Sequence, residues 1–145
     1  MSQQSTLNSI QPLLATVSTI LGLSPPIHAR LAAGEPILGP SGLLCRIHTQ
    51  GASHPLRAFP EIILPLSVRE LGGDDVVRLL AVQETLLTEC GWRLGMSEQG
   101  LLSLLPLMSE NGAETIAALL NQGQTIGRSV LNVLTQSAAS GDALS

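Results

Sequence analysis

The chain has 145 residues, enough for one domain with a substantial core but too few for two. Hydrophobic residues make up 44% of it and charged residues 12%, which is the opposite of the composition of disordered proteins. Seven arginines, no lysine and eleven acidic residues give a net charge of −4. This excludes a basic patch for nucleic acid, and it excludes any chemistry that needs a phosphate-loop or Schiff-base lysine.

The cysteine count and the N-terminal composition indicate where the protein works. Two cysteines are too few for a disulfide framework, which favours a reducing compartment. The first charged residue is Arg30, so the basic region of a secretory signal is missing. Polar residues interrupt the apolar stretches before they reach the 18 to 20 residues that span a bilayer. We therefore expect a cytoplasmic protein with no membrane insertion.

Helical periodicity begins near Ser9 and ends before Gly22. The apolar residues of this stretch follow the spacing of one helical face, and they are Ile10, Leu13, Leu14, Val17, Ile20 and Leu21. Pro25 and Pro26 should stop the helix, and the closely spaced prolines and glycines from there to Leu71 leave room only for short strands.

Three strands are expected in that middle region, at 36–38, Leu43–Thr49 and Glu61–Ser67, with an exposed loop over 50–60. In the second strand Cys45 and Ile47 fall on one face, and Arg46 and His48 fall on the other. The third strand contains Pro65, which lacks a donor and so should lie at an edge or a bulge.

The second half of the chain predicts a helix, a hairpin and a final helix. The helix over Val76–Cys90 is expected to end at Gly91. Its apolar arc covers roughly 160° and is interrupted by Gln83, and an arc of this width is wider than contact with one neighbouring element requires. Strands over 92–97 and 101–108 should form the hairpin. The last helix, from Asn111 to about Thr135, carries Gly123 and Gly127 on its apolar face, which predicts close packing there.

Helices gathered around an antiparallel sheet make the expected fold α+β. We expect a single domain over residues 9–135, between a flexible N-terminus at 1–8 and a flexible C-terminal tail at 136–145.

Residues that could carry chemistry do not assemble into a recognisable catalytic or metal motif. Cys45, His48 and His54 are metal-ligand types, but a spacing of three on a strand puts Cys45 and His48 on opposite faces. Cys90 falls at a helix C-terminus, where the dipole disfavours a thiolate. The glutamates are scattered singly, and the Gly39–Gly42 segment lacks the pattern of a nucleophile elbow. We therefore expect a protein that is not an enzyme, with no catalytic residue, no metal and no cofactor.

The order of elements resembles that of the class I type III secretion chaperones, the Tir-chaperone (CesT) family. The resemblance rests on the opening helix that ends in Ile20-Leu21-Gly22-Leu23, the strand Leu43–Thr49, the helix Val76–Cys90 running into Gly91-Trp92, the strand Leu101–Met108 and the long last helix. It implies an α-β-β-β-α-β-β-α fold that forms a homodimer. It also implies that the dimer binds the N-terminal region of a secreted effector in extended form, without ATP hydrolysis.

Two sets of residues follow as candidate contacts. The wide apolar arc and the family's usual interface together predict a dimer interface through Val76, Leu79, Val82, Leu86, Trp92 and Leu94. Trp92 suits a domain core equally well. The excess of hydrophobic residues and the proline-containing strands predict an effector-binding surface with a free sheet edge, through Leu13, Val17, Leu44, Ile47 and Ile63.

Two alternatives from other classes remain open. One is a small enzyme that works through His28, His48 or His54. The other is a protein that is itself exported, because the uncharged segment Ser2–Ser9 resembles the loose composition of type III export signals.

Overall fold

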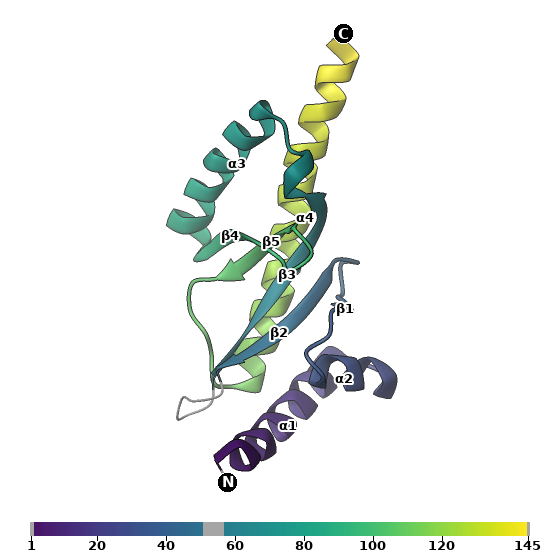
Figure 1. Ribbon diagram of the computed structural model, residues 1–145, viewed down its shortest axis with the longest axis vertical. Coiled ribbons are helices and arrows are strands. Elements are labelled where there is room, and N and C mark those ends of the chain that lie inside the picture. Colours follow the sequence, from purple (N-terminus) through teal and green to yellow (C-terminus); the bar gives the residue numbers. More distant parts are fainter. Residues whose placement is uncertain (1, 51–56, 145) are drawn as a thin grey trace.

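The computed structural model describes residues 2–50 and 57–144, with side chains for 11–50 and 57–135, as an α+β protein with four helices and a five-stranded antiparallel sheet (Figure 1). The helices are α1 (Ser2–Leu21), α2 (Pro25–Ala32), α3 (Gly73–Thr85) and α4 (Ala113–Leu144). The strands are β1 (Ile37–Leu38), β2 (Leu44–Gln50), β3 (Arg57–Ser67), β4 (Trp92–Met96) and β5 (Leu101–Pro106). Short helical turns, η1 (Val68–Glu70) and η2 (Leu86–Cys90), flank α3. None of the described helices has the length and apolar character of a membrane span.

The sheet has the strand order β1-β2-β3-β5-β4, so β3 lies at its centre and β4 and β1 at its edges. The predicted hairpin is confirmed, since β4 and β5 pair antiparallel from Trp92 opposite Pro106 to Met96 opposite Leu102. β2 pairs with β3 along its whole length, from Leu44 opposite Ile63 to Gln50 opposite Arg57.

Strand β3 tolerates two prolines at the centre of the sheet because neither has to donate a ladder hydrogen bond. Ala58 donates its N–H to the carbonyl of Glu110, so the nitrogen of Pro60, two residues later, faces that same side, before the β5 ladder starts at Ile62. Pro65 lies in the register shift between Ile63 and Ser67. This confirms the expectation of a bulge.

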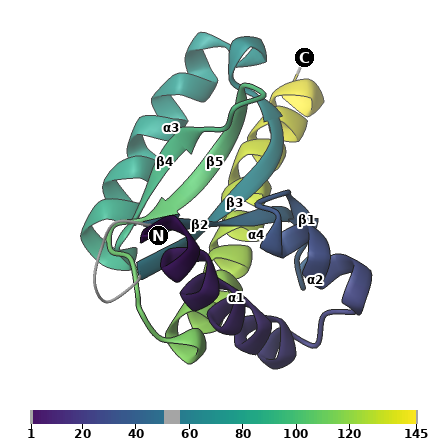
Figure 2. The ribbon, with the colours of Figure 1, turned by 60° about the horizontal axis from the view of Figure 1, so that its bottom comes forward.

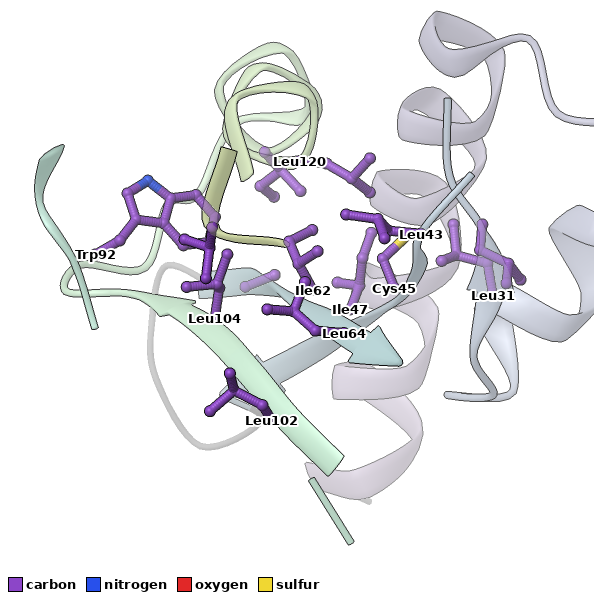
Figure 3. Packing of buried hydrophobic residues seen from close by; sticks show 14 of the residues in the cluster. Leu31, Leu43, Cys45, Ile47, Ile62, Leu64, Trp92, Leu102, Leu104 and Leu120 are labelled. Carbon is purple, nitrogen blue, oxygen red and sulfur yellow. The ribbon is translucent and has the colours of Figure 1, made fainter. Parts of the chain in front are cut away.

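Helix α4 packs directly on the sheet, and its glycines permit the close approach. A Cβ atom at Gly123 would lie 2.6 Å from both Ile62 Cγ1 and Trp92 Cη2, and one at Gly127 would lie 2.6 Å from Leu43 Cδ1. Both positions were expected to pack closely, and they do. Figure 3 shows Leu120 of α4 above Ile62 of the sheet, with Trp92 at one end of the cluster and Leu31 of α2 at the other.

Three local expectations were wrong. Pro25 and Pro26 do not exclude a helix; they start α2, because the first helical turn needs no N–H donors. β3 begins at Arg57, so residues 57–60 are strand rather than loop, while 51–56 lie outside the described residues. α3 begins at Gly73 rather than Val76, and Asp75 accepts a hydrogen bond from the N–H of Gly72 at 3.1 Å.

Both terminal helices are longer than their periodicity indicated. α1 begins at Ser2 rather than Ser9, and α4 continues to Leu144 rather than ending near Thr135. In Figure 1 the end of α4 projects beyond the sheet. The flexibility expected of residues 1–8 and 136–145 stays a prediction.

Candidate functional site

The expected effector contacts separate into core and surface. Val17, Ile47 and Ile63 have exposed fractions of 0%, 6% and 3%, so these three are core residues and the expectation of a contact surface there is not met. The reason is tertiary packing: Val17 of α1 and Ile47 of β2 belong to the same hydrophobic cluster, and Ile63 lies in the central strand of the sheet. Leu13 is half-buried, and Leu44 is 40% exposed. Leu44 is thus the expected contact that remains most open to a partner.

Strand β2 has an open edge beyond β1. Gly39 donates its N–H to the carbonyl of Leu43, so Leu43 faces β1, and by alternation the backbones of Cys45, Ile47 and Thr49 face the same way. β1 pairs only as far as Cys45. At Ile47 and Thr49 the backbone groups on this edge have no hydrogen-bond partner within residues 11–50 and 57–135, and of the two Thr49 is exposed whereas Ile47 is buried.

Exposed leucines border the open edge. Leu38 of β1 lies opposite Leu44 of β2, and their exposed fractions are 63% and 40%. Both side chains stand on the face of the sheet opposite Cys45 and Ile47, as the alternation of strand residues requires. The apolar pair therefore lies at the end of β1, just before the unpaired part of the β2 edge begins.

Helix α3 presents a second apolar surface. The exposed fractions are 46% for Val76, 67% for Val77 and 66% for Leu80, whereas Leu79 and Val82 are half-buried. Val77 and Leu80 were not among the expected interface residues. The wide apolar arc contained Leu80, but only the packed fold shows which side of that arc is left uncovered.

The other expected interface residues are oriented mainly inward. Leu86 is 4% exposed and Trp92 is fully buried, so both belong to the chain's own core, while Leu94 is half-buried. Trp92 donates from Nε1 to Gln122 Oε1 at 3.3 Å and packs where Gly123 leaves room. The choice between core and interface for Trp92 is thus decided in favour of the core.

An open apolar groove of about 560 Å³ separates α3 from α4. Figure 1 shows α3 beside the upper part of α4, and η2 follows α3 and leads into β4. The groove is lined by Arg78, Ala81, Val82, Thr85, Leu86, Cys90, Thr125, Ile126, Ser129, Val130 and Val133. It continues the exposed surface of α3 around the helix.

A buried polar cluster lies on β2 and β3. His48 donates from Nε2 to Glu61 Oε1 at 2.9 Å, and Arg46 Nε lies 3.6 Å from that same oxygen. Burial alone raises the pKa of Glu61, but the interactions of its carboxylate with His48, Ser103 and Arg46 together outweigh burial and hold that pKa below its usual value. The cluster is a charge-compensated part of the sheet.

The histidines and cysteines do not form a catalytic or metal-binding arrangement in the described residues. Ser18 Oγ is 2.6 Å from His28 Nδ1, but this pair joins α1 to α2, and no acidic side chain orients His28 among the described residues. Cys45 is fully buried, which raises its thiol pKa to about 11. No three metal-ligating side chains gather in the described part of the chain. His54 lies outside the described residues.

Comparison with known proteins finds no relative of this chain. No family model, no curated protein and no solved structure matches this chain. The resemblance to type III secretion chaperones therefore stays a prediction.

Proposed function

We propose that this protein is a type III secretion chaperone that binds the N-terminal region of a secreted effector in extended form. The observation that carries the proposal is the unpaired edge of β2, which is exposed at Thr49 and continues from the exposed pair Leu38 and Leu44 at the end of β1. An extended segment satisfies such an edge through main-chain hydrogen bonds, while its alternate side chains reach the neighbouring apolar surface. A disordered client has the free backbone that this mode of binding requires.

The chaperone acts as a homodimer in this proposal. Val77 and Leu80 are two-thirds exposed on α3, and an apolar surface of this kind is typical of an interface. A twofold axis near α3 would bring the same surface of two copies together. Val77 and Leu80 of each copy would then pack against the groove between α3 and α4 of the other copy.

The protein does not act as an enzyme in this proposal. Catalysis by a serine needs a base and a group that orients the base, and the Ser18–His28 pair has no such third group in the described residues. A screen of the purified protein against ester, peptide, phosphate and nucleotide substrates should give background rates. Activity that disappears on substitution of His28 or His48 would support the enzyme alternative instead.

Client binding is tested at the open edge. The client should first be identified by pull-down from the native host, and its purified N-terminal region titrated by calorimetry. Thr49→Pro removes an N–H that faces the open edge and leaves the ladder to β3 intact, so it should weaken binding roughly two- to tenfold, the contribution of one hydrogen bond of about 0.5–1.5 kcal/mol. Thr49→Val keeps the N–H and should bind as the wild type does.

The exposed leucines provide a second test of the same surface. Leu44→Asp should reduce client binding while the protein remains folded, because Leu44 is 40% exposed. Full affinity in both Thr49→Pro and Leu44→Asp would mean that the client binds elsewhere.

The dimer is tested with two substitutions on neighbouring elements. Leu80→Asp should give a folded monomer, because Leu80 is 66% exposed in the single chain. Leu86→Asp should unfold the protein, because it buries an unpaired charge in the core. Light scattering that shows a wild-type monomer at micromolar concentration would rule out the proposed dimer.

A further inference from the structure

The second edge of the sheet, β4, turns an alternating row of backbone groups away from its neighbour β5. Leu107 donates its N–H to the carbonyl of Gly91, so Gly91 faces β5, and by alternation Trp92, Leu94 and Met96 face away from β5. Such an edge pairs readily with another extended chain unless something blocks it. The strand is apolar and carries the 63% exposed Met96 at its end, so the edge needs protection.

The middle position of this edge is occupied by a side chain. Leu94 donates its N–H to Oε1 of Gln83 at 2.7 Å, across 11 residues of sequence. Figures 1 and 2 show α3, which carries Gln83, on the outer side of β4. The amide oxygen of Gln83 thus occupies the place that the carbonyl of an added strand would take.

Gln83 is also the residue that interrupts the apolar arc of its helix, and its bond to Leu94 gives a reason for a polar side chain there. We infer that Gln83 guards the β4 edge against strand addition by a second copy of β4. Two β4 strands related by a twofold axis are antiparallel, so their backbone groups are self-complementary. The proposed dimer through α3 leaves this guard in place, and the inference does not depend on the proposed client.

The test uses a fluorescently labelled peptide with the sequence of residues 91–97 as the probe. Gln83→Met keeps the length and helix propensity of the side chain but removes the acceptor, so the full-length variant should bind the peptide at least tenfold more tightly than the wild type. The amide of Leu94 should exchange with solvent at least tenfold faster by NMR. Gln83→Glu retains an acceptor and should behave as the wild type in both measurements.

A matched control separates edge opening from added apolar surface. Glu84→Met places the same side chain on the next, exposed position of α3 and should leave peptide binding and Leu94 exchange unchanged. Equal peptide affinity in the wild type and Gln83→Met would overturn the inference. It would also be overturned if the Leu94 amide became fast-exchanging without any gain in peptide binding. If both Gln83→Met and Gln83→Lys fail to fold, Gln83 supports the fold instead of guarding an edge, and the inference is wrong.

Discussion

Replacing Gly123 by alanine tests the packing of α4 against the sheet. In an exposed helix this change would stabilise the protein by about 1 kcal/mol, because alanine is the better helix former. Here the new Cβ would lie 2.6 Å from Ile62 Cγ1 and Trp92 Cη2, both of them in fully buried side chains. Carbon atoms pack at about 3.5–4.0 Å, so α4 would have to move by about 1 Å.

The two effects can be weighed against each other. A gap of about 1 Å between α4 and the sheet forfeits a quarter to a half of the dispersion energy of the contacts that it opens. Overpacked cores cost about 1–3 kcal/mol of folding free energy in measured cases. We expect the overpacking to exceed the helix gain and to lower the free energy of unfolding by about 1–3 kcal/mol. Gly127→Ala should cost less, because its first contact is the terminal methyl group Leu43 Cδ1, which can rotate away.

Urea unfolding at a fixed protein concentration, followed by the fluorescence of Trp92, measures these differences. Gly73→Ala is the matched control, because Gly73 begins α3 and a Cβ there meets nothing within 4 Å. It should raise the free energy of unfolding by about 0.4–1 kcal/mol. A Gly123→Ala protein as stable as the wild type would show that α4 does not pack as closely as described.

Other measurements test the buried groups. The pKa of Glu61 in the folded chain lies below its ordinary value of 4.5, so its ionised form stabilises the protein at pH values above 4.5 and this contribution is lost as the pH falls through the folded pKa. The stability difference between the wild type and Glu61→Gln should therefore shrink from pH 7 to pH 3, and a constant difference would contradict this. Iodoacetamide should modify half-buried Cys90 at least about tenfold faster than buried Cys45, as read by mass spectrometry; equal rates would place Cys45 at the surface. The single tryptophan should emit at short wavelength and resist acrylamide quenching until the protein unfolds, because Trp92 is fully buried.

Hydrophobic periodicity and the positions of glycine and proline were enough to locate most of the helices and strands. The alternation of Cys45 and Ile47 with Arg46 and His48 placed β2 correctly, and Gly91 ends the helical segment in a left-handed conformation as expected. The prolines were less informative, because the Pro25-Pro26 pair was expected to stop helical structure and instead begins α2. Local signals of this kind depend only on neighbouring residues, which the sequence supplies directly.

The candidate surfaces were decided by tertiary structure. An apolar residue has the same signature in the sequence whether a distant element covers it or leaves it open, so Ile47 and Leu44 were indistinguishable as contacts until the packed structure buried the first and exposed the second. Gln83 likewise read as a break in an apolar arc, and only the pairing of β4 with β5 turns Leu94 toward it. The sequence by itself determined which segments are helical or extended. Which faces stay uncovered, and which strand edge stays open, depends on contacts between residues far apart in the chain, and the fold alone decides those.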